Sequence, residues 1–476
     1  MSRKFQVKVV PISWIERQSH RLDCGPYMSG AMEARQLLNK HSARKDRLQD
    51  LTAGGIAGII NPGRITRLWV DDDQHGYPFL SSTDILQADL SNVGLIAKLA
   101  AKKNPRLIIK DRCTLITRSG TVGRMVYSRS EMKGMACTED VLRVIPDETK
   151  VSPGYIHAYL GTSFGIPQVV SGTYGSIITH LEPHHIADLP VPRLGAVEDK
   201  AHELVQQASD NLSEHQKLLN ESTALVFSSC GLVDQSRLEW LTDNSDTGFS
   251  VTSKNLSRSF RALNHSRRAE RIKNDIFSVN HSLLGDVLDL EWLRWRVMFQ
   301  RIPADRDHGI EVITQKPLFN LIPKGKWISR EYLLNHSPKY VVPNETILVA
   351  KQGTLGEHEL YCRCEFITGE RALARAYSDH CMRFVAKKDA IDPGYLFAFL
   401  RSQSAFRMLR SISEGSKQQD LHWRTVPLLP VPRSSSSIEK KIGEKIRHAF
   451  ALRESAITMY EQARTLVERT IEAGGR

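Results

Sequence analysis

The stretch Leu189-Pro190-Val191-Pro192-Arg193 (LPVPR) recurs 240 residues later as Leu429-Pro430-Val431-Pro432-Arg433. Proline lacks an amide hydrogen and biases the residue before it towards extended structure, so each copy is expected to be a rigid extended lead-in. A long helical pattern follows each copy, over residues 196–232 and 434–476. At 1.5 Å per residue such a helix is roughly 40 Å long, which is a spacer rather than a core element.

The apolar residues of both helices follow one another three and four positions apart. In the first helix they are Val197, Ala201, Leu204, Ala208, Leu218 and Leu225, interrupted by Asn211, His215 and Ser222. In the second they are Ile438, Ile442, Ala449, Leu452, Ala456, Met459, Ala463 and Leu466, with Lys445 as the polar exception. The two seams are in phase, which predicts that the helices pack along one another. The alternative is one amphipathic helix packed on the core of each domain.

Composition narrows the class of protein. The 476 residues allow about three domains, and 65 basic against 53 acidic residues give a net charge of +12, which favours a polyanionic partner. Seven scattered cysteines fit a reducing compartment rather than a disulfide scaffold. The first residues lack the apolar run of a signal peptide, and no stretch approaches 18 continuous apolar residues. We therefore expect a cytoplasmic protein that does not span a membrane.

The landmarks of the first half return in the same order in the second. Strands are expected at Tyr77–Leu80, Leu107–Ile109, Thr114–Thr117, Val141–Ile145 and Thr346–Ala350, and helices at Ser29–Leu48, Pro153–Leu160 and Pro393–Leu400. A repeat this long indicates two homologous domains, since solenoid repeats are several-fold shorter. Thr242–Asn255 is rich in Asp, Ser, Thr and Asn and is expected to lie in a linker. The predicted boundaries are 1–195 and 259–433 for the domains, 233–258 for the linker, and 196–232 and 434–476 for the helices.

A Gly-Thr-x-Gly loop follows one strand in each half. The loops lack the Lys-Ser/Thr of a phosphate loop, so they are tight structural turns or loops that approach a DNA backbone. Their candidate DNA-binding residues are Arg118, Ser119, Thr121, Lys351, Gln352 and Thr354. A second loop, Gly172–Ser176 against Gly415–Gln419, offers hydroxyl, amide and cationic donors, unless it is only solvated. Its candidate residues are Thr173, Tyr174, Ser176, Ser416, Lys417 and Gln418.

No catalytic constellation stands out. His180, His184 and His185 lack acidic or thiol partners for a metal site, and Cys362, Cys364, His380 and Cys381 lack paired CxxC spacing. Asp305, Glu311 and Lys316 resemble a nuclease set only loosely, and no methyltransferase tetrapeptide is present. A basic run, namely Arg258, Arg261, Arg267, Arg268, Arg271 and Lys273, is either a solvated helix face or a track along DNA.

Taken together, the landmarks resemble the specificity (S) subunit of bacterial type I restriction–modification systems. The segments that carry the resemblance are PFLSSTDI (78–85), LITRSGTVG (115–123), SPGYIHAYL (152–160) and SGTYGSIITHLEPHHIADLPVPR (171–193), then LLGDVL (283–288), ILVAKQGTLG (347–356), DPGYLFAFL (392–400) and LLPVPR (428–433). The second half lacks a match to PFLSSTDI, and residues 1–50 and 242–255 are outside the pattern. A related methylation-associated phage-defence system is therefore included in the resemblance.

The resemblance implies a bacterial or archaeal protein with an α+β fold. Two pseudo-repeated target recognition domains would be separated by two long helices that form an antiparallel coiled coil. Each domain would read one half of a bipartite, asymmetric DNA sequence. The subunit would be non-catalytic and would dock two DNA adenine methyltransferase (M) subunits and a restriction/translocase (R) subunit. S-adenosylmethionine, ATP and Mg²⁺ would then belong to the partners. The expected spacer and docking residues are Val197, Ala201, Leu204, Leu218, Ile438, Ile442, Leu452, Met459 and Leu466. The alternatives are a self-sufficient nuclease and a non-catalytic coiled-coil scaffold.

Overall fold

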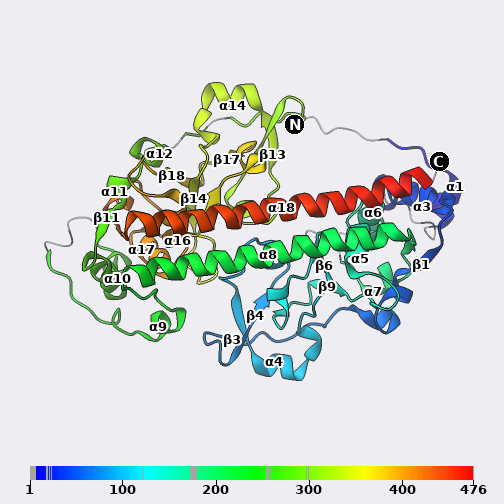
Figure 1. Ribbon diagram of the computed structural model, residues 1–476, viewed down its shortest axis with the longest axis horizontal. Helices are drawn as coiled ribbons and strands as arrows, with labels where there is room; N and C mark the ends of the chain where they lie inside the picture. Colours follow the sequence, from blue (N-terminus) through cyan, green and yellow to red (C-terminus); the bar gives the residue numbers. More distant parts are fainter. Residues whose placement is uncertain are drawn as a thin grey trace. The chain divides into compact units, whose positions relative to one another are not determined.

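The computed structural model describes the chain except residues 1–6, 18–19, 21, 23, 121, 172–179, 254–255, 257–258, 296, 299 and 475–476. The chain forms two compact units. Unit 1 comprises Met1–Leu86, Val93–Ser213 and Ser455–Arg476, and unit 2 comprises Gln87–Asn92 and Glu214–Glu454. Two long helices, α8 (Ala196–Ser229) and α18 (Ser436–Gly474), contribute residues to both units. Figure 1 draws α8 in green and α18 in red. The predicted fold class is confirmed, because each unit combines helices with sheets.

Unit 1 holds a four-stranded sheet of order β2-β9-β6-β7, a second of order β3-β5-β4-β8, and the pair β1-β10. Its strands are β1 (Lys45–Arg47), β2 (Ile59–Ile60), β3 (Trp69–Val70), β4 (Gly76–Leu80), β5 (Gly94–Ala97), β6 (Thr114–Thr117), β7 (Met125–Tyr127), β8 (Ala136–Cys137), β9 (Val141–Val144) and β10 (Pro190–Pro192). Its helices are α1 (Ile12–Arg17), α2 (Gly25–Met28), α3 (Ala31–Lys40), α4 (Lys98–Lys103), α5 (Pro153–Leu160), α6 (Gly165–Ser171) and α7 (Pro183–Ala187). Every residue of β6 and β9 is buried, so the first sheet lies inside the core.

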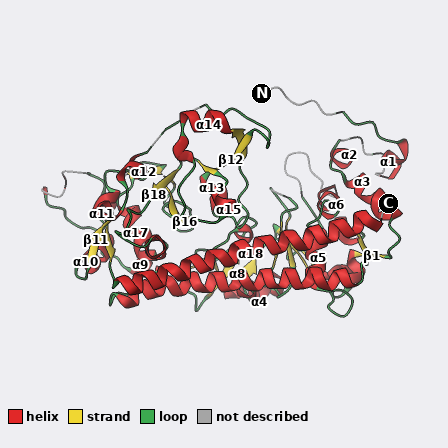
Figure 2. Ribbon diagram, turned by 45° about the horizontal axis from the view of Figure 1, so that its top comes forward, coloured by secondary structure: helices red, strands yellow, loops and turns green. Residues whose placement is uncertain are grey.

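Unit 2 holds the sheets β16-β14-β18, β13-β12-β17 and β15-β20-β19, and the pair β11-β21. Its strands are β11 (His281–Leu283), β12 (Gly309–Ile313), β13 (Lys326–Ser329), β14 (Thr346–Ala350), β15 (Gln352–Gly353), β16 (Cys364–Ile367), β17 (Ala376–Tyr377), β18 (Cys381–Phe384), β19 (Glu414–Gly415), β20 (Gln419–Asp420) and β21 (Pro430–Pro432). Its helices are α9 (Arg237–Thr242), α10 (Arg267–Phe277), α11 (Leu284–Val287), α12 (Leu290–Arg294), α13 (Gln315–Leu318), α14 (Arg330–His336), α15 (Glu370–Leu373), α16 (Pro393–Leu400) and α17 (Gln403–Ser411). Figure 2 shows helices in red and strands in yellow.

Both copies of LPVPR form a short strand, and each strand pairs with the first strand of its own unit. In unit 1, β10 pairs antiparallel with β1, and in unit 2, β21 pairs antiparallel with β11. The arginine that ends each copy then binds a glutamate in the first turn of the following helix, Arg193 to Glu198 and Arg433 to Glu439. The two units therefore repeat each other in hydrogen bonding, and not only in the order of their elements.

The helices α8 and α18 pack antiparallel within each unit. In unit 1, Ala201 and Val205 share a buried cluster with Ala463, Val467 and Ile471. In unit 2, the later residues of α8 pair with the earlier residues of α18: the Nδ1 atom of His215 lies 2.8 Å from the carbonyl oxygen of Ala449, and Lys445 binds Glu221 at 2.5 Å. Since residues near the start of one helix meet residues near the end of the other, the expected antiparallel arrangement is confirmed in both units.

The predicted seam is buried in part, at Ala201, Ala208 and Leu218 of α8 and at Ile442, Ala449, Ala456 and Ala463 of α18. The α8 residues that are buried along the seam are Ala201, Val205, Ala208, Leu212, His215, Leu219, Ser222 and Val226. Leu225 and Ile438 are exposed instead, and Val197, Leu204, Leu452, Met459 and Leu466 are half-buried. The prediction failed here because it followed apolar residue type, whereas the polar His215 and Ser222 keep the 3.5-residue spacing and are buried.

Two other expectations about local structure are wrong. The helix predicted to reach Leu48 ends at Lys40, and the strand β1 follows it, because pairing with β10 outweighs the helical pattern. The strand predicted at Leu107–Ile109 is a 3₁₀ turn over Pro105–Leu107 followed by a single bridge at Ile108. The proline and the Asn104 side chain, which accepts from the Arg106 amide, favour the turn.

Candidate nucleic-acid interface

Each unit places a basic residue at the end of its central strand. In unit 1, Arg118 directly follows β6; its amide donates to the carbonyl of Asp140 at 2.8 Å, and its carbonyl accepts from the Leu181 amide at 3.2 Å. In unit 2, Lys351 directly follows β14; its amide donates to the carbonyl of His380 at 3.1 Å, and its carbonyl accepts from the Leu421 amide at 2.9 Å. The repeat thus holds the two strand ends with equivalent backbone hydrogen bonds.

In unit 2 the two predicted loops come together in one small sheet. β20 pairs antiparallel with β15 on one side and with β19 on the other, so that Gln352 lies opposite Asp420 and Gly353 opposite Gln419. Between β19 and β20 the chain turns through Gly415, whose φ of 95° is in the left-handed region. A Cβ atom there would collide with the carbonyl of Gln418, so the turn requires glycine.

The tip of this hairpin consists of Ser416, Lys417 and Gln418, and all three residues are exposed. Thr354 in the neighbouring loop is exposed as well. Gln352, in contrast, is engaged within the protein: its Nε2 atom donates to Asp420 at 3.1 Å, and its backbone amide donates to Gln315 at 3.2 Å. The hairpin tip therefore offers side chains for base or phosphate contact, whereas Gln352 supports the sheet beneath it.

In unit 1 the predicted residues are paired with acids. Arg118 binds Glu182, and the Ser119 hydroxyl donates to Asp140 at 2.7 Å. Burial favours the neutral acid at Glu182, but hydrogen bonds from Arg118 and Asn61 hold the pKa of its carboxyl below the ordinary value. Arg118 is thus a neutralised cation, whereas the expected phosphate contact requires a free one. Thr121, Thr173, Tyr174 and Ser176 lie outside the described residues.

The strand-end loop of unit 2 is longer than its unit 1 counterpart, and arginines hold the additional residues. β6 and β7 are separated by Arg118–Arg124, whereas β14 and β16 are separated by Lys351–Arg363. Arg410 of α17 donates to the carbonyls of Leu355 at 2.7 Å and Gly356 at 3.0 Å, and Arg407 binds Glu357. These loop contacts were not predicted from the sequence, although the spacing of Arg407 and Arg410 places both on one helix face.

A third arginine completes this cluster. The guanidinium of Arg363 lies 3.5 Å from the centre of the Phe406 ring, and that of Arg410 lies 4.0 Å from the same ring. Burial, followed by the neighbouring Arg410 and Arg407, lowers the pKa of Arg363 to about 9. The three arginines have few carboxylate partners, so cation–π contacts and carbonyl acceptors help to stabilise their positive charges.

Lys351 borders a small aromatic and cationic pocket that the sequence analysis also missed. The pocket, of about 30 Å³, is lined by Lys351, Trp423 and Arg294 among others. The Trp423 ring lies 4.8 Å from the guanidinium of Arg294 and 5.2 Å from that of Arg424. Half-buried aromatic rings flanked by cations are typical of surfaces that contact nucleic acids.

The structure gives no support to the other candidate chemistries. In the described part of the chain, no group of three or more His, Cys, Asp or Glu side chains is placed to hold a metal ion. Glu311 of the loose nuclease set is engaged in the fold, since it accepts from the Gly325 amide at 2.8 Å and from Arg375 at 3.1 Å. No helix among the described residues is long and apolar enough to cross a membrane.

Comparisons with known proteins find similarity in solved structures alone. No family model matches the sequence, and no curated protein is similar to it. The chain is similar to the S subunit of the type I restriction–modification system from M. genitalium, with 10% identity over 91% of this chain and 95% of that one and a TM-score of 0.36. It is also similar to the HsdS subunit from Thermoanaerobacter tengcongensis, with 11% identity, coverage of 90% and 96%, and a TM-score of 0.26.

A third similar chain comes from a structure of type I restriction–modification complex assembly and conformational transition, with 10% identity, coverage of 91% and 97%, and a TM-score of 0.26. All three matches thus concern type I restriction–modification proteins. At these identities and TM-scores, the function has to be inferred from the residues of this chain itself.

Proposed function

We propose that this chain is the DNA-specificity subunit of a type I restriction–modification system or of a related methylation-linked phage-defence system. Residues 1–195 and 259–433 would be two target recognition domains, each reading half of a bipartite, asymmetric sequence. Residues 196–232 and 434–476 would be the spacer helices, and residues 233–258 the connection. The chain would act without catalysis of its own, and its partners would supply S-adenosylmethionine, ATP and Mg²⁺ chemistry.

One observation carries the proposal: an equivalent backbone framework presents different side chains in the two units. The strand ends at Arg118 and Lys351 are held by equivalent hydrogen bonds. The loops that follow them differ in length and charge. A single chain with two non-identical readers suits an asymmetric target, whereas a symmetric homodimer would require a palindrome.

The hairpin tip of unit 2 supports base readout by its chemistry. Gln418 can form two hydrogen bonds to the edge of an adenine, Lys417 can donate to a guanine or a phosphate, and Ser416 can contact either. All three are exposed on a turn that Gly415 fixes. A rigid turn with exposed donors positions them with little loss of conformational entropy on binding.

The proposal is tested by sequencing the methylome of the native host with and without the gene. Loss of one gapped methyl-adenine motif is the expected result. The variant Ser416→Ala/Lys417→Ala/Gln418→Ala should relax one half of that motif and leave the other half intact. Lys388→Ala, which removes an exposed lysine elsewhere in unit 2, is the matched control and should change neither half.

Other outcomes separate the alternative functions. An unchanged methylome would contradict the proposal. Metal-dependent cleavage of DNA by the purified chain, abolished at Asp305 or Glu311, would indicate a self-sufficient nuclease. Weak DNA binding that does not depend on sequence would indicate a scaffold. Exchange of residues 1–195 with those of a relative should transfer one half-site, because a scaffold carries no half-site with it.

A further inference from the structure

Residues 237–252, which follow α8 in unit 2, lie across the basic helix α10, and we call them the acidic strap. Asp246 accepts from the guanidinium of Arg268 at 2.8 Å and from the Ser266 hydroxyl at 2.7 Å. Asp243 binds Arg271. Two central arginines of the basic run, Arg268 and Arg271, are therefore paired with carboxylates of the preceding segment, which neutralise their charge.

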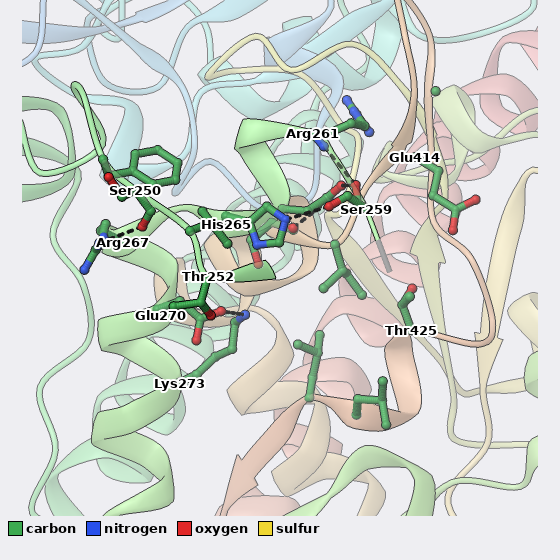
Figure 3. A pocket seen from close by; sticks show the side chains of 18 residues that line it. Ser250, Thr252, Ser259, Arg261, His265, Arg267, Glu270, Lys273, Glu414 and Thr425 are labelled. Atoms are coloured by element: carbon green, nitrogen blue, oxygen red, sulfur yellow. Dashed lines mark hydrogen bonds and ion pairs between the residues drawn. The ribbon is translucent and has the colours of Figure 1, made fainter. Parts of the chain in front are cut away.

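Two further cations of α10 line a pocket of unit 2. Figure 3 shows Arg267, which donates to the carbonyl of Ser250 at 3.0 Å, and Lys273, which binds Glu270 at 2.6 Å. They line a pocket of about 810 Å³ between α10, the end of the strap, and the hairpin at Glu414 and Gly415. The pocket leaves room for a charged group between the basic helix and the hairpin of the proposed DNA interface.

The contacts that hold the strap are mostly polar. No residue of α9, which forms the start of the strap, is buried. Trp240 contributes cation–π contacts, with its ring 4.2 Å from Arg268 and 4.8 Å from Arg407. Arg271 remains 59% exposed in its pair with Asp243. An exposed ion pair contributes at most about 1 kcal/mol and weakens with salt, so another anion can displace Asp243 at low cost. The pair of Arg268 and Asp246 is less exposed, at 22% and 20%, and is the stronger of the two contacts.

The carboxylates of the strap are anions at neutral pH. Hydrogen bonds from Ser245, and then the guanidinium of Arg271, hold the pKa of Asp243 below its ordinary value. At Asp246, burial opposes ionisation, but the Ser266 hydroxyl and Arg268 lower the pKa overall. Carboxylate oxygens that accept from guanidinium and hydroxyl groups occupy the kind of position that phosphate oxygens take in a DNA complex.

We propose that the basic face of α10 is a contact for the sugar–phosphate backbone of duplex DNA, and that Asp243 and Asp246 of the acidic strap occupy it in the free protein. The proposal rests on the proposed function, since it extends the DNA-binding surface beyond the hairpin. Backbone phosphates replace the two carboxylates on Arg268 and Arg271, and the strap leaves the helix. In the free protein the strap suppresses binding to DNA of any sequence.

The test uses the full chain and a fluorescent duplex that lacks the target motif, with affinity measured by anisotropy between 50 and 200 mM KCl. Asp243→Asn/Asp246→Asn should bind about 10-fold more tightly at 50 mM KCl, and the slope of log affinity against log salt should steepen by roughly 2, because each phosphate contact contributes about 0.9. Asp243→Asn alone, which leaves the Ser266 and Arg268 contacts intact, should give about half of this change. If the double variant folds poorly, Asp243→Asn alone tests the proposal.

The matched control is Asp307→Asn/Asp389→Asn, which removes two exposed carboxylates of unit 2 outside both the strap and α10. It should leave the affinity near that of the unchanged protein, whereas an equal gain would show that net charge alone matters and would overturn the proposal. Asp243→Asn/Arg271→Gln should lose the gain of Asp243→Asn. A gain that persists in this variant would also overturn it.

Hydrogen exchange of residues 236–247 gives a second readout. Addition of the duplex should accelerate exchange there, and unchanged or slower exchange would overturn the displacement of the strap. A duplex that carries the target motif, tested in parallel with the partner subunits present, separates the two proposals. If the duplex with the target motif is not bound specifically, the proposed function is contradicted. If it is bound specifically, but the strap variants bind the duplex without the motif no more tightly than the unchanged protein, only the proposal about the strap is contradicted.

Discussion

The strand-end loops of the two units share their backbone hydrogen bonds and differ in their side chains. Arg118 in unit 1 is neutralised by Glu182, whereas Lys351 in unit 2 borders Trp423 and Arg294. Backbone amides and carbonyls are the same for every residue type, so the framework can be repeated without repeating the sequence. The duplication therefore preserved the positions of the loops, whereas the chemistry of their side chains diverged.

The largest expected difference between the units concerns two equivalent buried arginines. Arg383 donates to the carbonyls of Lys339 at 2.9 Å and Cys381 at 2.7 Å and lies 4.3 Å from the Trp295 ring. Arg143 donates to Ile108 at 3.1 Å, but its Nε and Nη2 atoms have no hydrogen-bond partner among the described residues. Arg383→Met should lower the free energy of unfolding by about 3–5 kcal/mol, since it leaves buried carbonyls unpaired.

Arg143→Met should cost less than about 1 kcal/mol, because it removes a buried charge that the fold compensates poorly. Urea denaturation of both variants measures the difference. Equal losses in the two variants would show that the arginines play the same part in both units.

The next difference is a histidine in α5 where α16 has a phenylalanine. His157 lies between the rings of Tyr127 and Tyr460, and Phe397 lies between those of Phe366 and Phe450. Burial lowers the pKa of His157 from 6.5 to about 4. Between these values the unfolded chain binds a proton that the folded chain does not, so stability falls as the pH decreases, by up to about 1.4 kcal/mol per pH unit.

His157→Phe should remove this loss and gain about 2–3 kcal/mol relative to the unchanged protein on going from pH 7 to pH 4. Denaturation at the two pH values measures it. The reciprocal Phe397→His should introduce the same acid sensitivity into unit 2. A difference between His157→Phe and the unchanged protein that does not vary with pH would contradict the prediction.

A smaller effect is expected to be equal in the two units. The carboxylate of Glu198 accepts from Arg193 and from the Leu194 amide at 2.7 Å, and that of Glu439 accepts from Arg433 and from the Ser434 amide at 3.1 Å. Both side chains are buried. Glu198→Gln and Glu439→Gln should each cost about 2 kcal/mol, because each breaks the ion pair between a buried carboxylate and the arginine of its copy. Arg193 keeps a second charge partner, Asp46, at 3.1 Å. Thermal unfolding of both variants checks that the losses agree within about 1 kcal/mol.

The smallest effect concerns the pair that distinguishes the two strand-end loops. Arg118 and Glu182 retain 14% and 21% of their side-chain exposure. Glu182→Gln should cost less than about 1 kcal/mol, since surface ion pairs contribute little to stability. The variant also frees the Arg118 charge and should tighten DNA binding a few-fold at low salt. A large loss of stability with unaltered DNA binding would mean that the pair belongs to the framework rather than to the interface.

Much of the framework was predictable from local patterns. The strands at Thr114–Thr117 and Thr346–Ala350 and the helices from Pro153 and Pro393 are where the sequence placed them. In these segments apolar patterning and proline at the first helical turn agree with the tertiary environment. Some seam positions of α8 were predicted wrongly, because residue type alone cannot distinguish the buried His215 from a histidine that faces solvent.

The sequence by itself determined the duplication, the two long helices and their packing along one another, because these depend on periodicities and lead-ins that are local in the chain. The tertiary structure decided which charges are available. Arg118 meets Glu182 across 64 residues, and Arg410 meets Leu355 across 55. Asp246 meets Arg268 across 22. Whether a cation is free, paired or buried depends on such distant partners, and only folding brings them within hydrogen-bonding distance.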